Sequence, residues 1–175
     1  MKKIIIILML SCTKLTFAQM QLLPLQNNSA FGAMFPCIGE KKSVNSGTGV
    51  SNALQCRVDN GSSVCIFITA EQPLDVQSFN KNGWDFIREV NNQYALGMDK
   101  NYKSIYGKLL DKGGLGKVYA YELTRYQDGM QINVKGMWLV SGAKMLRGAV
   151  SCAPVKTNYM KNEIDIFFNS FSIIR

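Results

Sequence analysis

The stretch KVYAYELTRYQDGMQINVKGMWLV, residues 117–140, carries the strongest structural pattern in the chain. Asp128-Gly129 divides it, and this dipeptide is typical of two-residue hairpin turns. After the turn every second residue is apolar or glycine: Met130, Ile132, Val134, Gly136, Trp138 and Val140. Such alternation predicts antiparallel strands over 117–126 and 130–140, each with one buried face.

Strands and turns continue on both sides of this hairpin. Residues 103–110 predict another strand, which the turn Asp111-Lys112-Gly113-Gly114 joins to the next. Ser141-Gly142 predicts a turn into a strand over 144–153, and Pro154 ends that strand. We therefore expect an antiparallel meander in the second half of the chain, followed by a helix over about residues 158–169.

The first half predicts one strand, one hairpin and one long helix. The strand covers residues 30–35, and the Gly- and Ser-rich residues 39–51 predict a loop or an irregular edge, with a short strand around Val44 as an alternative. Asp75 or Ser78 is expected to cap a helix that breaks at Asn82-Gly83 and ends near Gly97. Its apolar stripe has helical spacing and consists of Phe79, Phe86, Ile87, Val90 and Tyr94.

A second hairpin determines the predicted disulfides. Asn60-Gly61 predicts a two-residue turn, and this register places Cys56 opposite Cys65 at a non-hydrogen-bonded position. Cα atoms lie about 4.5 Å apart there, which a disulfide can bridge. Cys37 and Cys152 remain for the second bond. A zinc site is the alternative, but the chain has no histidine, and a Cys-x8-Cys spacing across a tight hairpin disfavours it.

The N-terminus has the pattern of a secretory signal peptide over residues 1–18. Two lysines precede the apolar residues 4–10, and Thr16-Phe17-Ala18 predicts cleavage before Gln19. A lipoprotein signal with the lipid on Cys12 is the alternative. The apolar stretch is shorter than the roughly 20 residues of a membrane-spanning helix, so no transmembrane segment is expected. We therefore expect a periplasmic protein with a flexible lead-in over 19–29 and one domain over 30–175.

Composition excludes several classes of function. The 175 residues include 20 basic and 12 acidic residues and no histidine. Three lysines would leave with the signal peptide, so the mature net charge is +5, with 17 basic and 12 acidic residues. The basic residues are scattered, which indicates a solvated surface and no nucleic-acid partner, and a weak preference for an acidic partner or an anionic surface is the alternative. Without histidine the chain has no Ser-His or Cys-His nucleophile pair and lacks the commonest zinc ligand.

Two short patterns resemble catalytic or ligand-binding motifs but depart from them in sequence or in context. A phosphate-binding loop requires Ser or Thr directly after its lysine. The segment Gly113-Gly114-Leu115-Gly116-Lys117 is followed by valine instead. Ser141-Gly142-Ala143-Lys144 lies between two strands, whereas the acyl-enzyme Ser-x-x-Lys motif begins a helix. Two acidic pairs are interpreted as solvated helix charges: Asp85 with Glu89, and Glu163 with Asp165. The chain therefore predicts no catalytic residue, no metal site and no cofactor.

Aromatic residues are frequent on the strands of the predicted sheet. Tyr119 and Tyr121 share one face of their strand, and Trp138 lies on the next strand. Tyr and Trp are favoured in protein interfaces. If the face that carries them is open, these three residues are a candidate protein-binding surface.

The order of the elements resembles the PsbP/Mog1-like family. A first strand ends in Phe35-Pro36-Cys37, and a hairpin, a long helix and an antiparallel meander follow. The last helix reads Phe167-Phe168-Asn169-Ser170-Phe171, similar to the closing segment of small exported bacterial members. The resemblance covers roughly residues 30–174 and implies an α+β fold, a central antiparallel sheet flanked by two main helices in an α/β/α sandwich. The four mature cysteines depart from the family pattern.

The resemblance implies a binding or accessory role, because most members of the family are not enzymes. We therefore expect a non-enzymatic binding or accessory protein of the cell envelope with a protein partner. A periplasmic immunity protein that neutralises a secreted toxin is the first alternative. A small hydrolase is the second alternative, although no nucleophile–base pair can be assembled from this sequence.

Overall fold

The computed structural model describes residues 21–24, 31–46, 49–59, 61, 63–154 and 160–173. Seven strands form one antiparallel sheet in the order β3-β4-β5-β9-β8-β7-β6, and three form a smaller sheet in the order β1-β2-β10. The elements of the large sheet are β3 Glu40–Ser46, β4 Gly49–Asp59, β5 Val64–Pro73, β6 Lys103–Asp111, β7 Lys117–Gln127, β8 Met130–Ser141 and β9 Lys144–Ala153. The others are β1 Gln21–Pro24, β2 Phe31–Phe35, β10 Ser172–Ile173, α1 Val76–Asn82, α2 Trp84–Met98, the short 3-10 turn η1 Gly113–Leu115 and α3 Lys161–Asn169.

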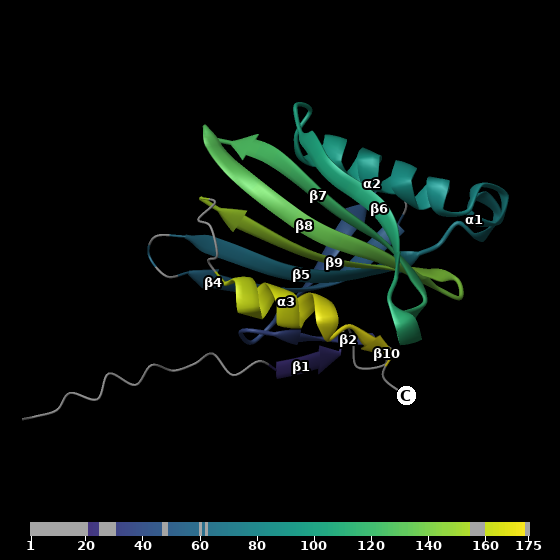
Figure 1. Cartoon of the computed structure of the whole chain (residues 1–175), viewed down its shortest axis with the longest axis horizontal. Helices are drawn as coiled ribbons and strands as arrows, with labels where there is room; N and C mark the ends of the chain where they lie inside the picture. The colour runs from purple at the N-terminus through teal and green to yellow at the C-terminus, as the bar shows by residue number, and fades with distance from the viewer. Residues whose placement is uncertain are drawn as a thin grey trace, which may run out of the picture.

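The large sheet is covered on both faces. Helices α1 and α2 pack on one face, which we call the α2 face, and α3 with the small sheet packs on the other, the α3 face (Figure 1). A buried apolar cluster fills the space between the sheet and each cover. The predicted α+β sandwich is therefore confirmed.

The predicted meander is present with small changes in its boundaries. Gln127 pairs with Met130 and Ser141 with Lys144, so both connections are two-residue turns. Asp128 and Gly129 have positive φ angles of 52° and 74°, the backbone region that this type of turn requires.

The helical segment breaks where the sequence indicates. The Asp75 carboxylate accepts a hydrogen bond from the Ser78 backbone N–H at 3.0 Å, which makes Asp75 the N-cap of α1. Gly83 has φ 59° and separates α1 from α2. Helix α2 continues one residue beyond the predicted end at Gly97.

Two segments contain more strand than the sequence predicts. Residues 21–24, within the predicted lead-in, form β1 and pair with β2. Glu40–Ser46, within the predicted loop or irregular edge, forms the regular strand β3 around Val44 and pairs with β4. Both are edge strands, where pairing through the backbone needs little hydrophobic alternation and charged residues are common. The predicted signal peptide, residues 1–18, lies outside the described residues and stays a prediction.

The β4–β5 hairpin differs in register from the predicted one. Asp59 pairs with Val64 and Cys56 with Phe67, so residues 60–63 connect the strands instead of two residues. The Asp59 carboxylate accepts a hydrogen bond from the Gly61 backbone N–H at 2.8 Å, a local turn of the Asx type. A shift of two residues keeps each side chain on its face, so the hydrophobic pattern cannot distinguish the two registers.

The predicted disulfide pairing is wrong, although all four cysteines of the described residues are paired. Cys65 is bonded to Cys152, and Cys37 to Cys56. Cys65 and Cys152 lie directly opposite each other on β5 and β9, with Cα atoms 4.2 Å apart. Ser141 and Lys144 close a two-residue turn as a hydrogen-bonded pair, so every second residue of β9 from Lys144 to Cys152 directs its backbone groups toward β8. Cys65 and Cys152 are therefore a non-hydrogen-bonded pair, the geometry that the sequence analysis assigned to Cys56 and Cys65.

The closing aromatic motif forms the centre of the α3 face. Phe167 is fully buried and meets four other phenylalanine rings edge-on, with ring centroids 5.2 to 5.4 Å apart. These rings come from β2, β5, α3 and the segment after α3: Phe35, Phe67, Phe168 and Phe171. One ring therefore joins both sheets to the last helix.

Ser170 and Gly148 position this motif. The Ser170 hydroxyl donates to the Phe167 carbonyl oxygen at 2.9 Å and accepts from the Met34 N–H at 2.7 Å, which ties the end of α3 to β2. The ring of Phe171 lies where a Cβ of residue 148 would be, so only glycine fits at that position of β9. The Phe-x-x-Ser-Phe pattern is thus explained by packing.

Candidate binding cleft

The aromatic residues proposed as a binding surface lie in the core. Tyr119, Tyr121 and Trp138 are 8%, 2% and 2% exposed. Alternation predicts that the two tyrosines share a face, but α2 covers that face and packs Ile87 and Ala95 into the same cluster. The expectation of an exposed aromatic surface is therefore wrong.

These aromatic residues surround a buried cation, Arg147. Its guanidinium carbon lies 3.4 Å from the ring centre of Tyr94 and 5.7 Å from that of Trp138. Arg147 Nε donates to the Tyr121 hydroxyl at 2.7 Å, and burial raises the pKa of that phenol. Among the described residues no carboxylate forms an ion pair with Arg147. Aromatic faces, which attract cations, stabilise it instead.

Replacing Arg147 by lysine is expected to lower the free energy of unfolding by about 2 kcal/mol, the size of a desolvated cation–π contact. Lysine keeps the charge but has no planar group to stack on Tyr94 and no Nε donor for Tyr121. Urea unfolding measures the change. Arg88→Lys is the matched control, because Arg88 is exposed on α2 and should change stability by no more than about 0.5 kcal/mol. Equal losses for the two variants would contradict the role of the aromatic faces.

An open cleft of about 500 Å³ lies at the end of the large sheet where β7 turns into β8. Its apolar floor comes from three strands and consists of Val64, Met130, Ile132 and Ala153. Its polar rim comes from β4, the end of β7 and the β7–β8 turn and consists of Arg57, Asp59, Gln127 and Asp128. The strand registers place the floor on the α2 face. We call these residues the end cleft.

The floor of the end cleft offers apolar surface to solvent. Met130 is 46% exposed, although it continues the apolar alternation of β8, whereas Ile132 beside it is buried. An apolar centre with a polar rim is the usual composition of a protein-binding patch.

The rim carries a fixed pair of opposite charges. Arg57 and Asp59 are both half-exposed and their charged groups lie 3.2 Å apart. The hydrogen bond from the Gly61 backbone N–H is the main cause that holds the pKa of the Asp59 carboxyl below its usual value, and the hydrogen bond from Arg57 is the second. Asp59 therefore stays ionised and is a weak base, since a general base works best with a pKa near the ambient pH.

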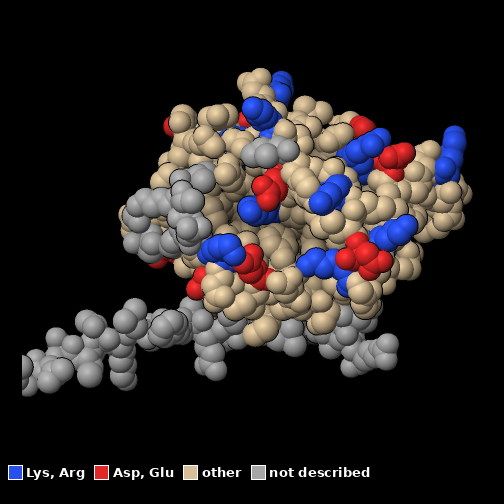
Figure 2. Space-filling model, viewed as in Figure 1, with Lys and Arg blue, Asp and Glu red and all other residues tan. Residues whose placement is uncertain are grey.

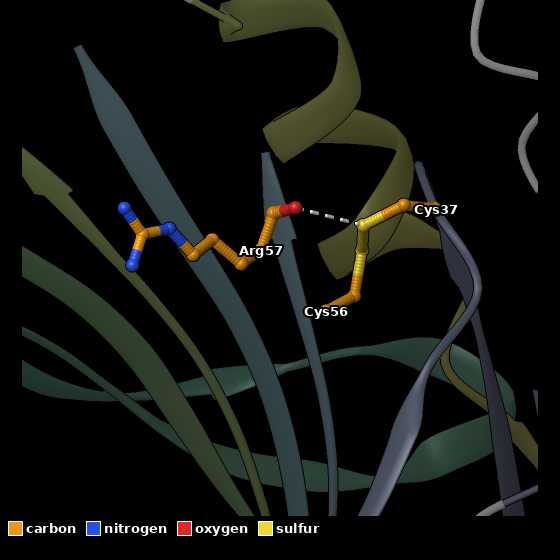
Figure 3. Close-up of a disulfide and its surroundings, with 3 residues drawn as sticks. All are labelled: Cys37, Cys56 and Arg57. Atoms are coloured by element: carbon orange, nitrogen blue, oxygen red, sulfur yellow. Dashed lines mark hydrogen bonds between the residues drawn. A yellow bond between two sulfur atoms is a disulfide. The ribbon is translucent and has the colours of Figure 1, made fainter. Parts of the chain in front are cut away.

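Both disulfides adjoin the end cleft. Cys56 precedes Arg57, Cys65 follows Val64 and Cys152 precedes Ala153. Successive residues of a strand point to opposite faces, so the sulfurs lie on the α3 face and the cleft on the α2 face. Figure 3 shows the Arg57 side chain pointing away from the Cys37–Cys56 bond, while its carbonyl oxygen lies 3.5 Å from Cys37 Sγ. The 65–152 bond thus joins β5 to β9, and the 37–56 bond joins β4 to the segment after β2, both on the face opposite the cleft.

The motifs that sequence analysis rejected lie outside this cleft. Gly113–Lys117 forms η1 and the start of β7, and Ser141–Lys144 forms the β8–β9 turn. Asp85 is paired with Arg88, and Asp165 with Lys161, on exposed helix surfaces. Within the described residues, no three metal-binding side chains cluster, and no helix is long and apolar enough to cross a membrane.

Sequence reasoning did not identify the end cleft. Its floor is assembled from β5, β8 and β9, which meet only through the sheet topology. One local signal was available, because Met130 follows Asp128-Gly129 and an apolar residue next to a hairpin turn lies at the sheet's margin.

No family model and no curated protein matches the chain. Among solved structures, cyanobacterial PsbP (CyanoP) from Synechocystis sp. PCC 6803 is similar, with a TM-score of 0.51 and 15% identity over 93% of this chain and 97% of that one. The T6SS immunity protein TplEi from Pseudomonas aeruginosa, solved with an "L" peptide, has a TM-score of 0.37 and 6% identity over 81% of this chain and 51% of that one.

The two disulfides are consistent with an oxidising, extracytoplasmic compartment. The similarity to CyanoP extends over nearly the whole of both chains, at an identity that supports a shared fold alone. The layered sheet, the closing helix and this similarity agree with the resemblance seen in the sequence: the chain has the PsbP-like α+β fold.

Proposed function

We propose that this protein is an exported, non-enzymatic binding protein of the cell envelope, and that its end cleft holds a segment of a protein partner. The observation that supports this is the apolar floor and charged rim on strands of which β5 and β9 are joined by one disulfide and β4 is anchored by the other. Rigid strands lose little conformational entropy on binding, which favours affinity.

The exposure of the cleft favours a protein partner over a small molecule. Small-molecule sites bury most of the ligand among enclosed apolar walls. Here Met130 projects from the floor and the charged groups of Arg57 and Asp59 lie at the open rim. Such a surface suits an apolar side chain of a partner, surrounded by polar contacts.

Binding also fits the chemistry of the cleft better than hydrolysis. The chain contains no histidine, and the one rim carboxylate with a shifted pKa is a weaker base than usual. The remaining shifted groups are held in turns, caps or the core: Asp75, Asp99, Tyr119, Tyr121 and Arg147.

Replacing Met130 by glutamate is expected to abolish partner binding, because a charge would have to be buried on the apolar floor. The tagged wild-type protein and variant are compared by quantitative capture from an envelope extract of cells that express the chain. Leu96→Glu is the matched control, since Leu96 is 45% exposed on α2 and lies outside the cleft.

The proposal requires a captured protein that Met130→Glu loses and Leu96→Glu retains. No such protein, or equal loss with both variants, would overturn it. The identity of the captured protein separates the two roles considered from the sequence. An envelope component indicates an accessory role, and a toxin whose effect the protein neutralises in a challenge assay indicates an immunity role.

A further inference from the structure

Strand β6 forms one open edge of the large sheet. Its only neighbour in the described sheet is β7. The pairing is interrupted between Ser104 and Tyr106 and is regular from Tyr106 to Asp111. The Lys112 N–H bonds to the Gly116 carbonyl oxygen, so by alternation Gly107, Leu109 and Asp111 direct their backbone groups away from β7. The edge can therefore accept another strand.

The same edge is strongly basic. Residues 99–117 contain five lysines and two aspartates. Lys103 and Lys108 lie on β6, Lys100 and Lys112 lie in the connections on either side of it, and Lys117 is the first residue of β7. In the space-filling view, basic side chains are spaced along the region that β6 occupies in Figure 1 (Figure 2). None of the five forms an ion pair with a described carboxylate.

The nearby acids are already engaged. Asp111 accepts the Gly113 N–H at 2.9 Å, and Asp99 accepts the N–H groups of Asn101 and Tyr126, both at 2.8 Å. Glu122, opposite Tyr106 on β7, is paired with Lys135 at 3.1 Å. These hydrogen bonds leave the aspartates charged, but two aspartates face five lysines in residues 99–117, so the positive potential of the edge is only partly compensated.

The two faces of β6 differ in character. The register places Lys103, Tyr106 and Lys108 on the α3 face, and Lys108 Nζ lies 5.2 Å from the Tyr106 ring centre. Leu109 lies on the α2 face and is 40% exposed. A strand added to this edge would meet positive charge on one face and apolar surface on the other.

We propose that the β6 edge binds an extended acidic segment of another protein by strand addition, with acidic and apolar residues alternating in that segment. Its backbone would pair with Gly107, Leu109 and Asp111. Its carboxylates would lie near Lys103 and Lys108, and its apolar side chains near Leu109. A second copy of the chain does not fit, because pairing two β6 edges brings like charges together.

Lysines on an edge strand also discourage aggregation, which is the simpler explanation of their presence. Protection requires a charge within the strand, which Lys108 provides. Protection against aggregation does not account for the lysines in both flanking turns or for the exposed Leu109. These features support an acidic partner and do not depend on the end cleft, with which the segment Tyr106–Asp111 shares no residue.

The test uses a fluorescently labelled seven-residue peptide of alternating glutamate and valine and the disulfide-bonded protein. Anisotropy should show saturable binding that weakens with salt. Lys103→Glu/Lys108→Glu should weaken binding by about tenfold or more. Lys42→Glu/Lys81→Glu changes the net charge equally on β3 and α1 and should change affinity by less than about twofold. Thermal melts confirm that the variants fold, and Lys103→Gln/Lys108→Gln replaces the first variant if it does not.

Amide hydrogen exchange separates strand addition from charge attraction alone. The peptide should slow exchange at Gly107, Leu109 and Asp111, whose N–H groups face outward. Absence of binding, equal losses in both double variants, or binding without this protection would each overturn the proposal. Preferential binding to vesicles of anionic phospholipid, with no binding of the peptide, would overturn it in favour of a membrane surface.

Discussion

Replacing Cys65 and Cys152 together by alanine is expected to lower the free energy of unfolding by about 4–5 kcal/mol. The two residues are 87 positions apart in the sequence, so their bond restricts a large loop of the unfolded chain. The loss is expected to be close to the limit that chain entropy sets, because the bond joins two directly opposed residues and Cys65 is fully buried. Urea unfolding of the double variant measures it.

Cys37→Ala/Cys56→Ala is the internal comparison. These cysteines are only 19 positions apart, and the same reasoning gives about 3 kcal/mol. The order of the two losses in unfolding free energy is more informative than either value. Each variant lacks one disulfide attached to the large sheet, so the two differ mainly in the length of the loop that is released. Non-reducing peptide mapping should show the 37–56 and 65–152 linkages in the wild-type protein. A larger loss for the shorter loop would contradict the entropic explanation, and a 56–65 linkage would contradict the strand register.

Phe167→Ala is expected to lower the free energy of unfolding by about 3–5 kcal/mol, the usual cost of removing a buried phenylalanine ring. The ring is fully buried and contacts four other rings, so the cavity would lie between both sheets and α3. Thermal or urea unfolding measures the loss.

Phe168→Ala is the matched control in the same helix. Phe168 is half-buried, so removing its ring should cost about 1–2 kcal/mol, part of the transfer free energy of a buried aromatic side chain. If both variants lost the same stability, Phe167 would not be the centre of the α3 face. If Phe167→Ala left the stability unchanged, the packing explanation of the closing motif would be wrong.

Local structure could be predicted from the sequence wherever residues close together in the chain determine it. Asp75 caps α1 because its carboxylate reaches an N–H three residues ahead. Gly83 separates two helices because its φ of 59° is unfavourable for other residues. The β8 strand follows from its alternation, which burial on one face requires. The end cleft could not be predicted from the sequence, because the residues of its floor lie on strands that are far apart in the chain.

The disulfide pairing shows the limit of reasoning from local signals. A non-hydrogen-bonded cross-strand pair was the right geometry, but it belongs to β5 and β9 instead of β4 and β5. The Asx turn at Asp59 displaces the hairpin register by two residues, a shift that preserves every side chain's face. The strand that places Cys152 beside Cys65 is β9, and the two cysteines are 87 positions apart in the sequence.

The sequence by itself determined the meander and the break between α1 and α2, because each depends on periodicity or on contacts between near neighbours. Only the tertiary structure decided which cysteines are bonded, that Tyr119, Tyr121 and Trp138 lie under α2, and where the end cleft and the basic β6 edge are. Alternation assigns a side chain to one of two faces of a strand. Which strands are neighbours, and which face a helix covers, depends on the packing of the whole chain.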